Sequence, residues 1–164
     1  MELLIIIFIL LLCFLGLSWF AGSDAPYVPT KMKVIKSILK LANLSPGKVF
    51  YELGSGDGRV VLEAGKLGAK SYGIEQSWLR VWWSRYQARQ LKLKNSHFFH
   101  GDIFHRQYFP ADVVYIYMLP KAVDQLESKL QQELKKGAVV ITQTYHFKNW
   151  PPFKKDENFY LYRA

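Results

Sequence analysis

The sequence has few of the residues that build disulfide frameworks and metal sites. Cys13 is the single cysteine among 164 residues, so the chain cannot form a disulfide within itself, and it contains no Cys-x-x-Cys pair. The four histidines are scattered, and none has a carboxylate or serine at a spacing typical of catalysis. We therefore expect no metal site, and no candidate for a catalytic acid or base can be identified from the sequence.

Acidic residues are also in deficit. The chain has 13 Asp and Glu against 22 Lys and Arg, which gives a formal net charge of +9. This excess favours an anionic partner, which could be nucleic acid, an anionic membrane surface or an acidic protein. Because 50% of the residues are hydrophobic and 16% are aromatic, the composition excludes a disordered chain and predicts one packed domain with an appendage.

The appendage is the largely apolar run over residues 3–20, which contains no charge. Its length is at the short end of what crosses a bilayer as a helix. A cleaved signal peptide fits less well, because Glu2 stands where positive charge belongs and the run exceeds an ordinary h-region. A buried core helix would be amphipathic, and this run is not. The sequence predicts a transmembrane anchor over 1–22, a linker over 23–30 and a folded domain over 31–164.

Lysines follow the apolar run, at positions 31, 33, 36 and 40, whereas Glu2 precedes it. The positive-inside rule then predicts a single-pass membrane protein whose domain lies on the cytoplasmic side. The same lysines could contact anionic headgroups or could form a solvated helix face, and the sequence leaves both open.

A glycine turn stands at the centre of the domain. An apolar strand over residues 49–53 leads into three glycines at alternate positions and then into a helix-forming segment. Such a turn lets a ligand approach the backbone and offers it the free N–H groups of a helix start. Arg59 occupies the third-glycine position of the dinucleotide fingerprint, and no Lys-Ser/Thr pair marks a P-loop. The pattern instead resembles motif I of class I S-adenosylmethionine (AdoMet) methyltransferases. Its members are Glu52, Gly54, Gly56 and Gly58.

Two further strands end in acidic residues. Residues 69–75 end at Glu75, and residues 97–102 end at Asp102. A carboxylate about 20 residues beyond the glycines is where a ribose diol is bound in open α/β sheets. The resemblance to methyltransferases implies that Asp102 accepts from the adenine amino group. The predicted cofactor-binding residues are Glu52, Gly54, Ser55, Gly56, Gly58, Glu75, Gln76, Asp102 and Ile103.

The remaining periodicities predict an α/β fold. The resemblance to class I methyltransferases makes a Rossmann-like class I methyltransferase sheet with helices on both faces the expected fold, preceded by one N-terminal transmembrane helix. Its closing hairpin is expected to be shortened. Thr30 is the expected N-cap of the first domain helix. Helices are predicted over 31–42, 59–66, 78–94 and 121–136, and further strands over 111–118, 138–147 and 159–162.

The predicted helix over 78–94 interleaves aromatic and basic residues. It carries Trp78, Trp82, Trp83 and Tyr86 beside a stripe formed by Arg85, Arg89 and Lys92. This mixture can bind nucleic acid through stacking and charge. The favoured alternative places the aromatic side chains in the core and leaves a solvated basic edge.

Residues 117–120 follow the predicted strand over 111–118, at the sheet edge where a methyl group would leave the cofactor. Methyltransferases that act on adenine or glutamine often carry Asn/Asp-Pro-Pro-Tyr/Phe here. This chain has Met-Leu-Pro-Lys over 118–121 instead, which argues against that substrate class.

The combination of an apolar N-terminal run, Tyr-Val-Pro-Thr over 27–30, the glycine turn over 52–59 and the aromatic, basic helix resembles one family. This family is the membrane-anchored lysine methyltransferases that act on the ATP synthase c-subunit and the adenine nucleotide translocase, and the similarity runs from about Pro26 to Pro152. It implies a protein-lysine N-methyltransferase whose substrate is a membrane-embedded or membrane-apposed protein. It also implies that residues 27–30 close over the cofactor or the substrate lysine. The predicted substrate-site residues are Tyr27, Pro29, Thr30, Tyr117, Pro120 and Trp150.

Three alternatives stay open at the level of sequence. The net charge suits a nucleic-acid methyltransferase, although a membrane anchor would be an odd addition to one. A small-molecule methyltransferase is the second alternative, and the third is a membrane scaffold that binds AdoMet without turnover.

Overall fold

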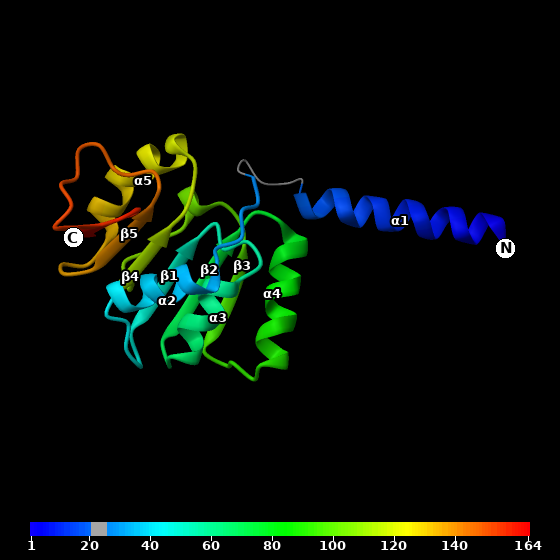
Figure 1. Ribbon diagram of the computed structural model, residues 1–164, viewed down its shortest axis with the longest axis horizontal. Helices are drawn as coiled ribbons and strands as arrows, with labels where there is room; N and C mark the ends of the chain where they lie inside the picture. Colours follow the sequence, from blue (N-terminus) through cyan, green and yellow to red (C-terminus); the bar gives the residue numbers. More distant parts are fainter. Residues whose placement is uncertain (21–25) are drawn as a thin grey trace.

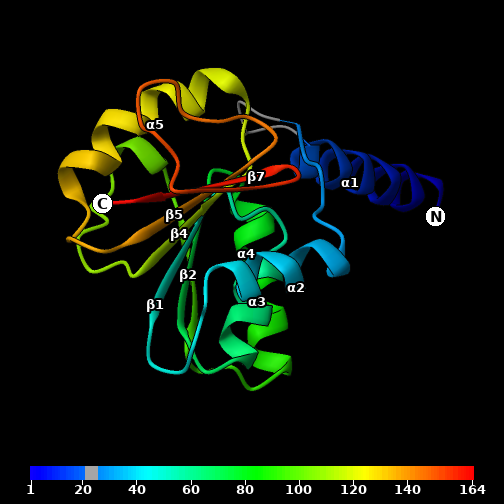
Figure 2. The same ribbon diagram turned by 60° about the vertical axis from the view of Figure 1, so that its left-hand side comes forward.

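The domain is built on a seven-stranded sheet with strand order β3-β2-β1-β4-β5-β7-β6 (Figure 1). The structure, a computed structural model, describes residues 1–20 and 26–164, with side chains omitted at 18–20. Strands β1 to β5 are parallel, whereas β7 lies antiparallel beside β5 (Figure 2) and β6 pairs with β7 at the edge. The strands are β1 (Val49–Leu53), β2 (Lys70–Glu75), β3 (Ser96–His100), β4 (Val113–Ile116), β5 (Val139–Gln143), β6 (Lys154–Asp156) and β7 (Phe159–Arg163).

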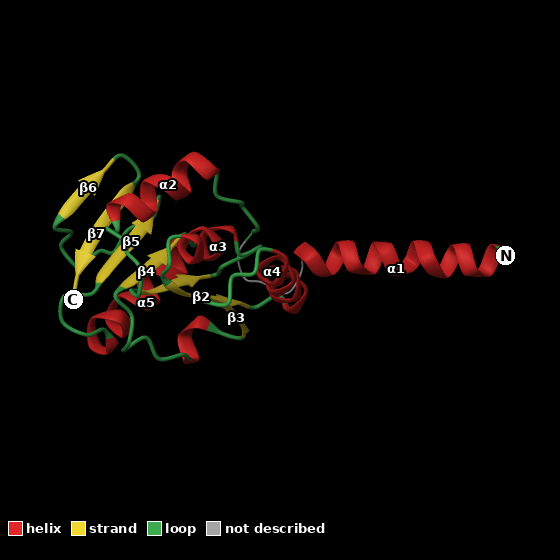
Figure 3. Cartoon of the chain, turned by 90° about the horizontal axis from the view of Figure 1, so that it is seen from below, coloured by secondary structure: helices red, strands yellow, loops and turns green. Residues whose placement is uncertain are grey.

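Helices cover both faces of this sheet, as the sequence predicts (Figure 3). On one face, Ile35, Ile38 and Leu39 bury the apolar side of α2 beside α3, and α4 packs next to α3. On the other face, α5 buries three aliphatic side chains at helical spacing, Val123, Leu126 and Leu130. The helices of the domain are α2 (Met32–Leu41), α3 (Arg59–Lys66), α4 (Trp78–Gln90) and α5 (Pro120–Glu133), with a short 3-10 helix η1 (Ile103–His105) before β4.

Several predicted boundaries differ from the structure for local reasons. Helix α4 ends at Gln90, because Lys92 adopts a positive φ of 55° that a helix cannot continue through. Thr30 is not the N-cap of α2, since Lys31 holds that position and the helix begins at Met32. The closing hairpin has one strand more than the sequence predicts, because the three-residue strand β6 pairs with β7.

The aromatic residues of α4 do not lie in the core, so that prediction is wrong. The exposed fractions of Trp78, Trp82, Trp83 and Tyr86 are 55%, 59%, 38% and 44%. The buried side of α4 carries Arg80, Val81, Ser84 and Ala88 instead. A small residue is needed at Ser84, because α4 packs closely on the start of α3 at this point. A methyl group added to Gly58 at the start of α3 would lie 2.6 Å from the Ser84 hydroxyl.

The apolar N-terminal run forms helix α1 (Glu2–Phe20), which projects from the domain and contacts α4 (Figures 1 and 3). Its apolar side chains are exposed along its length, from Leu3 to Leu17. In the part of the chain that the structure describes, no helix combines the length and the hydropathy needed to cross a membrane. The predicted transmembrane anchor over 1–22 is therefore not confirmed. Its last two residues and residues 23–25 of the predicted linker lie outside the described residues.

The packing at Gly58 generates a stability prediction. Gly58 has φ +81°, and a Cβ there would lie 2.6 Å from both the Phe98 ring and the Ser84 hydroxyl. Gly58→Ala should therefore lower the free energy of unfolding by about 2–4 kcal/mol, the sum of left-handed strain and overpacking. Gly137→Ala is the matched control, because Gly137 has φ +86° with open space around its Cα. It should lose only about 1–2 kcal/mol. Equal losses in urea unfolding would contradict the packing argument.

Candidate active site

A cavity of about 560 Å³ opens at the carboxyl ends of the parallel strands. It lies beside the β1–β4 boundary, where the strand order reverses and where ligands bind in open α/β sheets. Its volume is within the range of small-molecule sites. Its walls come from the glycine turn after β1, the segment 26–30, the end of β2, η1, the start of α5 and the residues after β5.

The glycine turn is tied to the end of β2 by Glu75. The backbone N–H groups of Gly54 and Ser55 both donate to the carbonyl of Ile74, at 2.9 Å each. The N–H of Gly56 donates to Oε2 of Glu75 at 2.9 Å. Gly54 and Gly56 adopt φ values of +74° and +52°, which glycine adopts without strain. The loop thus takes its shape from one strand end and one carboxylate.

The other oxygen of Glu75 holds the start of α4. Its Oε1 accepts from the N–H of Ser77 at 2.9 Å and from the guanidinium of Arg80 at 3.4 Å. That guanidinium also lies 4.8 Å from the centre of the Tyr27 ring, a cation–π contact. Glu75, predicted from the sequence as a ribose ligand, therefore already accepts three hydrogen bonds while lining the cavity.

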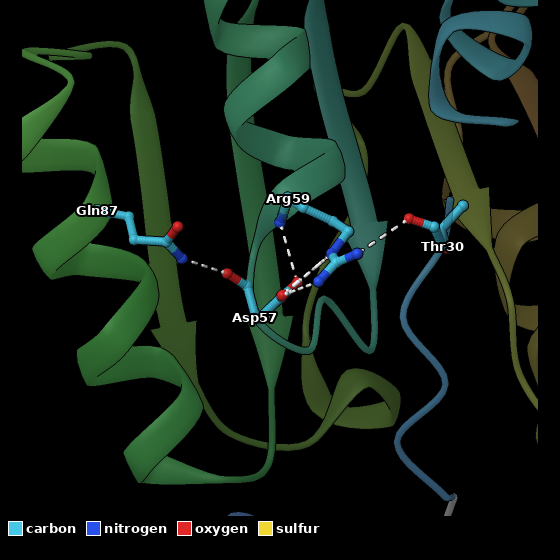
Figure 4. Close-up of polar contacts among 4 residues, drawn as sticks. All are labelled: Thr30, Asp57, Arg59 and Gln87. Carbon is cyan, nitrogen blue, oxygen red and sulfur yellow. Dashed lines mark hydrogen bonds and ion pairs between the residues drawn. The ribbon is translucent and has the colours of Figure 1, made fainter. Parts of the chain in front are cut away.

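A second polar network fixes the segment 26–30 against the glycine turn (Figure 4). Arg59 donates to the carboxylate of Asp57, with distances of 2.6–3.0 Å from its side-chain nitrogens, and to the carbonyl of Thr30 at 3.3 Å. Gln87 from α4 donates to the backbone carbonyl of Asp57 at 3.0 Å. Burial raises the pKa of Asp57, but the hydrogen bonds and charge of Arg59 outweigh it, so this pKa lies below its ordinary value. Asp57 therefore stays ionised at the cavity wall.

The most unusual group of the cavity is Glu52. Its side chain is buried, and its Oε2 has no hydrogen-bond partner among the described residues. Burial, followed by repulsion from Asp57 and Glu75, raises the pKa of Glu52 well above its ordinary value. A buried polar atom without a partner is costly, and a ligand that donates to it or carries positive charge removes that cost. Asp57 and Glu75 on the same wall are already paired with Arg59 and Arg80, so Glu52 is the carboxyl group left to face a ligand such as AdoMet, which bears a sulfonium and an ammonium group.

Most of the predicted site residues line this one cavity. For the cofactor they come from the ends of β1 and β2 and from η1, and for the substrate they come from the segment 26–30 and the end of β4. The predicted residues on the cavity wall are Glu52, Gly54, Ser55, Gly56, Glu75, Gln76, Ile103, Tyr27, Pro29, Thr30 and Tyr117.

Two predicted cofactor residues lie off the wall. Gly58 starts α3, and its Cα faces the ring of Phe98 rather than the cavity. The carboxylate of Asp102 accepts from the N–H of Phe104 at 2.8 Å and pairs with His105 at 3.0 Å. Asp102 thus caps η1, and the residues that follow it form the wall.

Two predicted substrate residues also lie elsewhere. Pro120 is the first residue of α5, and its neighbours Leu119 and Lys121 line the cavity in its place. Trp150 is buried in the core, where its ring lies 5.4 Å from that of Phe147 and 5.5 Å from that of Tyr162. It cannot line a substrate channel, because these contacts enclose it.

Several residues that line the cavity were not predicted from the sequence. Arg80 carries no sequence signal for its place, since it reaches the site by being buried under Tyr27. Thr144 and Tyr145 directly follow β5, so the rule that ligands lie at strand ends would have found them. The wall residues absent from the prediction include Asp57, Arg59, Arg80, Phe104, Met118, Leu119, Lys121, Ala122, Gln125, Thr144 and Tyr145.

Comparisons with known sequences give consistent relatives. The profile of the ANTKMT methyltransferase domain matches residues 52–154, and that of the histone methylation protein DOT1 matches residues 17–80. The ATP synthase c-subunit lysine N-methyltransferase of Xenopus laevis is 36% identical over 128 residues, covering 77% of this chain and 56% of that protein. The protein-lysine N-methyltransferase of Saccharolobus islandicus is 30% identical over 130 residues, covering 77% and 81%. The chain thus spans little more than half the length of its animal relative.

The fold is similar to those of solved methyltransferase structures. An RNA methyltransferase from Salinibacter ruber, in complex with S-adenosyl-L-homocysteine, has a TM-score of 0.76 and 33% identity, covering 83% of this chain and 92% of that one. A SAM-dependent methyltransferase from Thiobacillus denitrificans, also with S-adenosyl-L-homocysteine, has a TM-score of 0.64 at 20% identity, which supports the fold alone.

The matched region contains the glycine turn and the strand ends that line the cavity. The family match covers more than half of the chain, and relatives above 30% identity share both its sequence and its fold. The chain belongs to the ANTKMT methyltransferase domain family of Rossmann-like class I methyltransferases.

Proposed function

We propose that this protein is an AdoMet-dependent protein-lysine N-methyltransferase that acts on a membrane or membrane-associated protein. The observation that carries the proposal is the buried, unpartnered Oε2 of Glu52 in an acid-lined cavity beside the glycine turn. Relatives of similar sequence are named as lysine N-methyltransferases, and the structural relatives from Salinibacter ruber and Thiobacillus denitrificans were solved with S-adenosyl-L-homocysteine.

Different residues of the cavity would bind different parts of AdoMet. Glu52 and Asp57 would face its positively charged amino-acid end, the bare backbone at Gly54 and Gly56 would allow close approach, and Glu75 would contact the ribose through its remaining lone pair. When bound, AdoMet supplies the methyl group: the acceptor nitrogen forms the new N–C bond as the C–S bond breaks, and a proton leaves the nitrogen.

A lysine acceptor must be neutral to attack. With an ordinary pKa near 10.4, only about one lysine in 10³ is neutral at pH 7. An apolar, aromatic channel lowers this pKa by desolvation and tolerates the methylammonium product. Tyr27, Tyr117, Leu119 and Tyr145 provide such a wall. None of the histidines lines the cavity, so the proposed catalysis rests on alignment of the reacting atoms, which can supply several kcal/mol.

The membrane part of the proposal rests on α1. Its apolar side chains are exposed along the helix, and soluble monomers rarely expose so large an apolar surface. We propose that α1 attaches the chain to a membrane as a single-pass anchor over 1–22, with 23–30 as linker. The lysines of α2 favour the cytoplasmic side for the methyltransferase domain over 31–164.

A nucleic-acid methyltransferase is the second candidate. The net charge of +9 favours it, and the Salinibacter ruber relative is named as an RNA methyltransferase. A small-molecule methyltransferase and a scaffold without turnover are the remaining alternatives. All of them share the AdoMet site, so the acceptor is what distinguishes them.

The identity of the methyl acceptor can be tested by incubating the purified protein with labelled AdoMet and membranes of its host. Label should appear in a protease-sensitive band and be recovered as methyl-lysine after acid hydrolysis.

Glu75→Gln should lower AdoMet affinity about 10–100-fold, because an amide replaces the charged acceptor of three hydrogen bonds. It is a cleaner variant than Glu75→Ala, which would leave the N–H groups of Gly56 and Ser77 without an acceptor.

Glu63→Gln is the matched control for that assay, since Glu63 forms an ion pair with Lys66 on the surface of α3 and is not among the residues that line the cavity. It should keep wild-type affinity and turnover. Label in nuclease-sensitive material would contradict the lysine proposal, and AdoMet binding without any label would favour the scaffold.

The raised pKa of Glu52 generates a second prediction. A carboxyl whose pKa is higher in the folded than in the unfolded chain lowers stability as pH rises from the unfolded value through the folded one. Glu52→Gln should remove this loss. Without AdoMet it should match the wild type at acidic pH and exceed its unfolding free energy by about 1–3 kcal/mol at alkaline pH. It should also weaken AdoMet binding about tenfold. Parallel stability curves across pH would refute the assignment.

A further inference from the structure

The outer face of α4 exposes an aromatic cluster that the proposed catalysis does not use. The ring of Tyr86 lies 6.1 Å from that of Trp82 and 5.7 Å from that of Trp83, both stacked, and Trp78 adds a fourth exposed ring one turn before Trp82. Exposed clusters of large apolar side chains mark interaction sites. Tryptophan and tyrosine in particular suit a boundary between an apolar and an aqueous phase.

The same face is basic. A shallow groove between α4 and β3 is lined by Arg85, Arg89, Lys92, Lys94 and His97 among others. Arg85 is held in place by donating to the carbonyl of Phe98 at 3.0 and 2.7 Å. Residues 76–101 contain no Asp or Glu, so no acidic side chain from this stretch offsets the positive charge. An anionic partner therefore complements this face.

The position of α1 distinguishes between a membrane and nucleic acid as the anionic partner of this face. Helix α1 contacts α4 and projects from the side of the domain that α4 forms (Figures 1 and 3). A bilayer that holds the exposed apolar surface of α1 would thus lie against the outer face of α4. Nucleic acid also complements rings and basic side chains, but the continuity with an apolar helix favours a membrane.

We propose that the outer face of α4 docks on an anionic bilayer surface, with its rings in the headgroup region and its basic side chains on lipid phosphates and carboxylates. This inference rests on the proposed attachment through α1. It adds an orientation: α4 begins at the cavity, where Ser77 and Arg80 bond to Glu75. Docking would therefore hold the cavity next to lysines that lie near the headgroups.

A fluorescent probe on α4 tests the orientation separately from attachment. In a Cys13→Ser background, Gln90→Cys places a single label beside Tyr86 and Trp83 on α4. Gln132→Cys, at an exposed position on α5 across the sheet, places the matched control label. Full-length protein is reconstituted in vesicles of neutral lipid or with about 30% anionic lipid, each containing brominated quencher lipid. Flotation of the vesicles reports attachment through α1.

The label at position 90 should be quenched at least about fivefold more than the label at 132 in anionic vesicles, and added salt should reduce this difference. Trp82→Ser with Arg89→Glu should abolish the difference while flotation stays unchanged. Phe109→Ser with Lys154→Glu, which removes an exposed ring and a lysine elsewhere, should preserve it.

Equal quenching at both labels in protein that floats would overturn the docking proposal and leave the attachment intact. Protein that does not float would overturn both. Loss of salt-sensitive RNA binding in the Trp82 and Arg89 variant, with unchanged quenching, would assign the face to nucleic acid and likewise overturn the proposal.

Discussion

One buried carboxylate connects the parts of the candidate active site. Glu75 accepts from the N–H of Gly56 with one oxygen, and from Ser77 and Arg80 with the other. The same Arg80 lies against the ring of Tyr27. The glycine turn, the start of α4 and the segment that covers the cavity therefore take their positions from a single group. A carboxylate at the end of a parallel strand can do this because the strand fixes its direction, and three donors compensate for its burial.

The two ends of the cavity differ in chemistry, and the difference matches the proposed reaction. Around the glycine turn the wall is acidic, and Glu52 lacks a partner that a cationic ligand would provide. Beyond the end of β4 the wall combines Tyr117, Met118 and Leu119 with the cation of Lys121. Partial desolvation and a nearby positive charge both favour the neutral form of an amine. The exposed rings of α4 and the apolar surface of α1 lie on one side of the domain. The proposed membrane surface would therefore meet the protein beside the cavity.

The sequence predicted the parts of the site that depend on strand ends. Glu52 and Glu75 could be placed together because the carboxyl ends of neighbouring parallel strands meet at one edge of a sheet. It could not predict the direction in which Asp102 turns, since capping of η1 competes with the ligand for that side chain. The exposure of Trp82 was mispredicted because aromatic residues usually mark a buried face. Here Ser84 packs so closely on Gly58 that a large ring would not fit at that position of α4. Strand β6 was missed because a three-residue, charged edge strand has no apolar alternation.

The central claim is that this acid-lined cavity binds AdoMet through its positive charge. Calorimetric titration of the full-length protein with AdoMet tests it most directly, in buffers of different ionisation heat and at several pH values below about 7, where the amino group of the ligand is already protonated. The account predicts saturable one-to-one binding with net release of a fraction of a proton, as the cation lowers the raised pKa of Glu52. Absence of saturable binding, or binding without proton release at every one of these pH values, would contradict it.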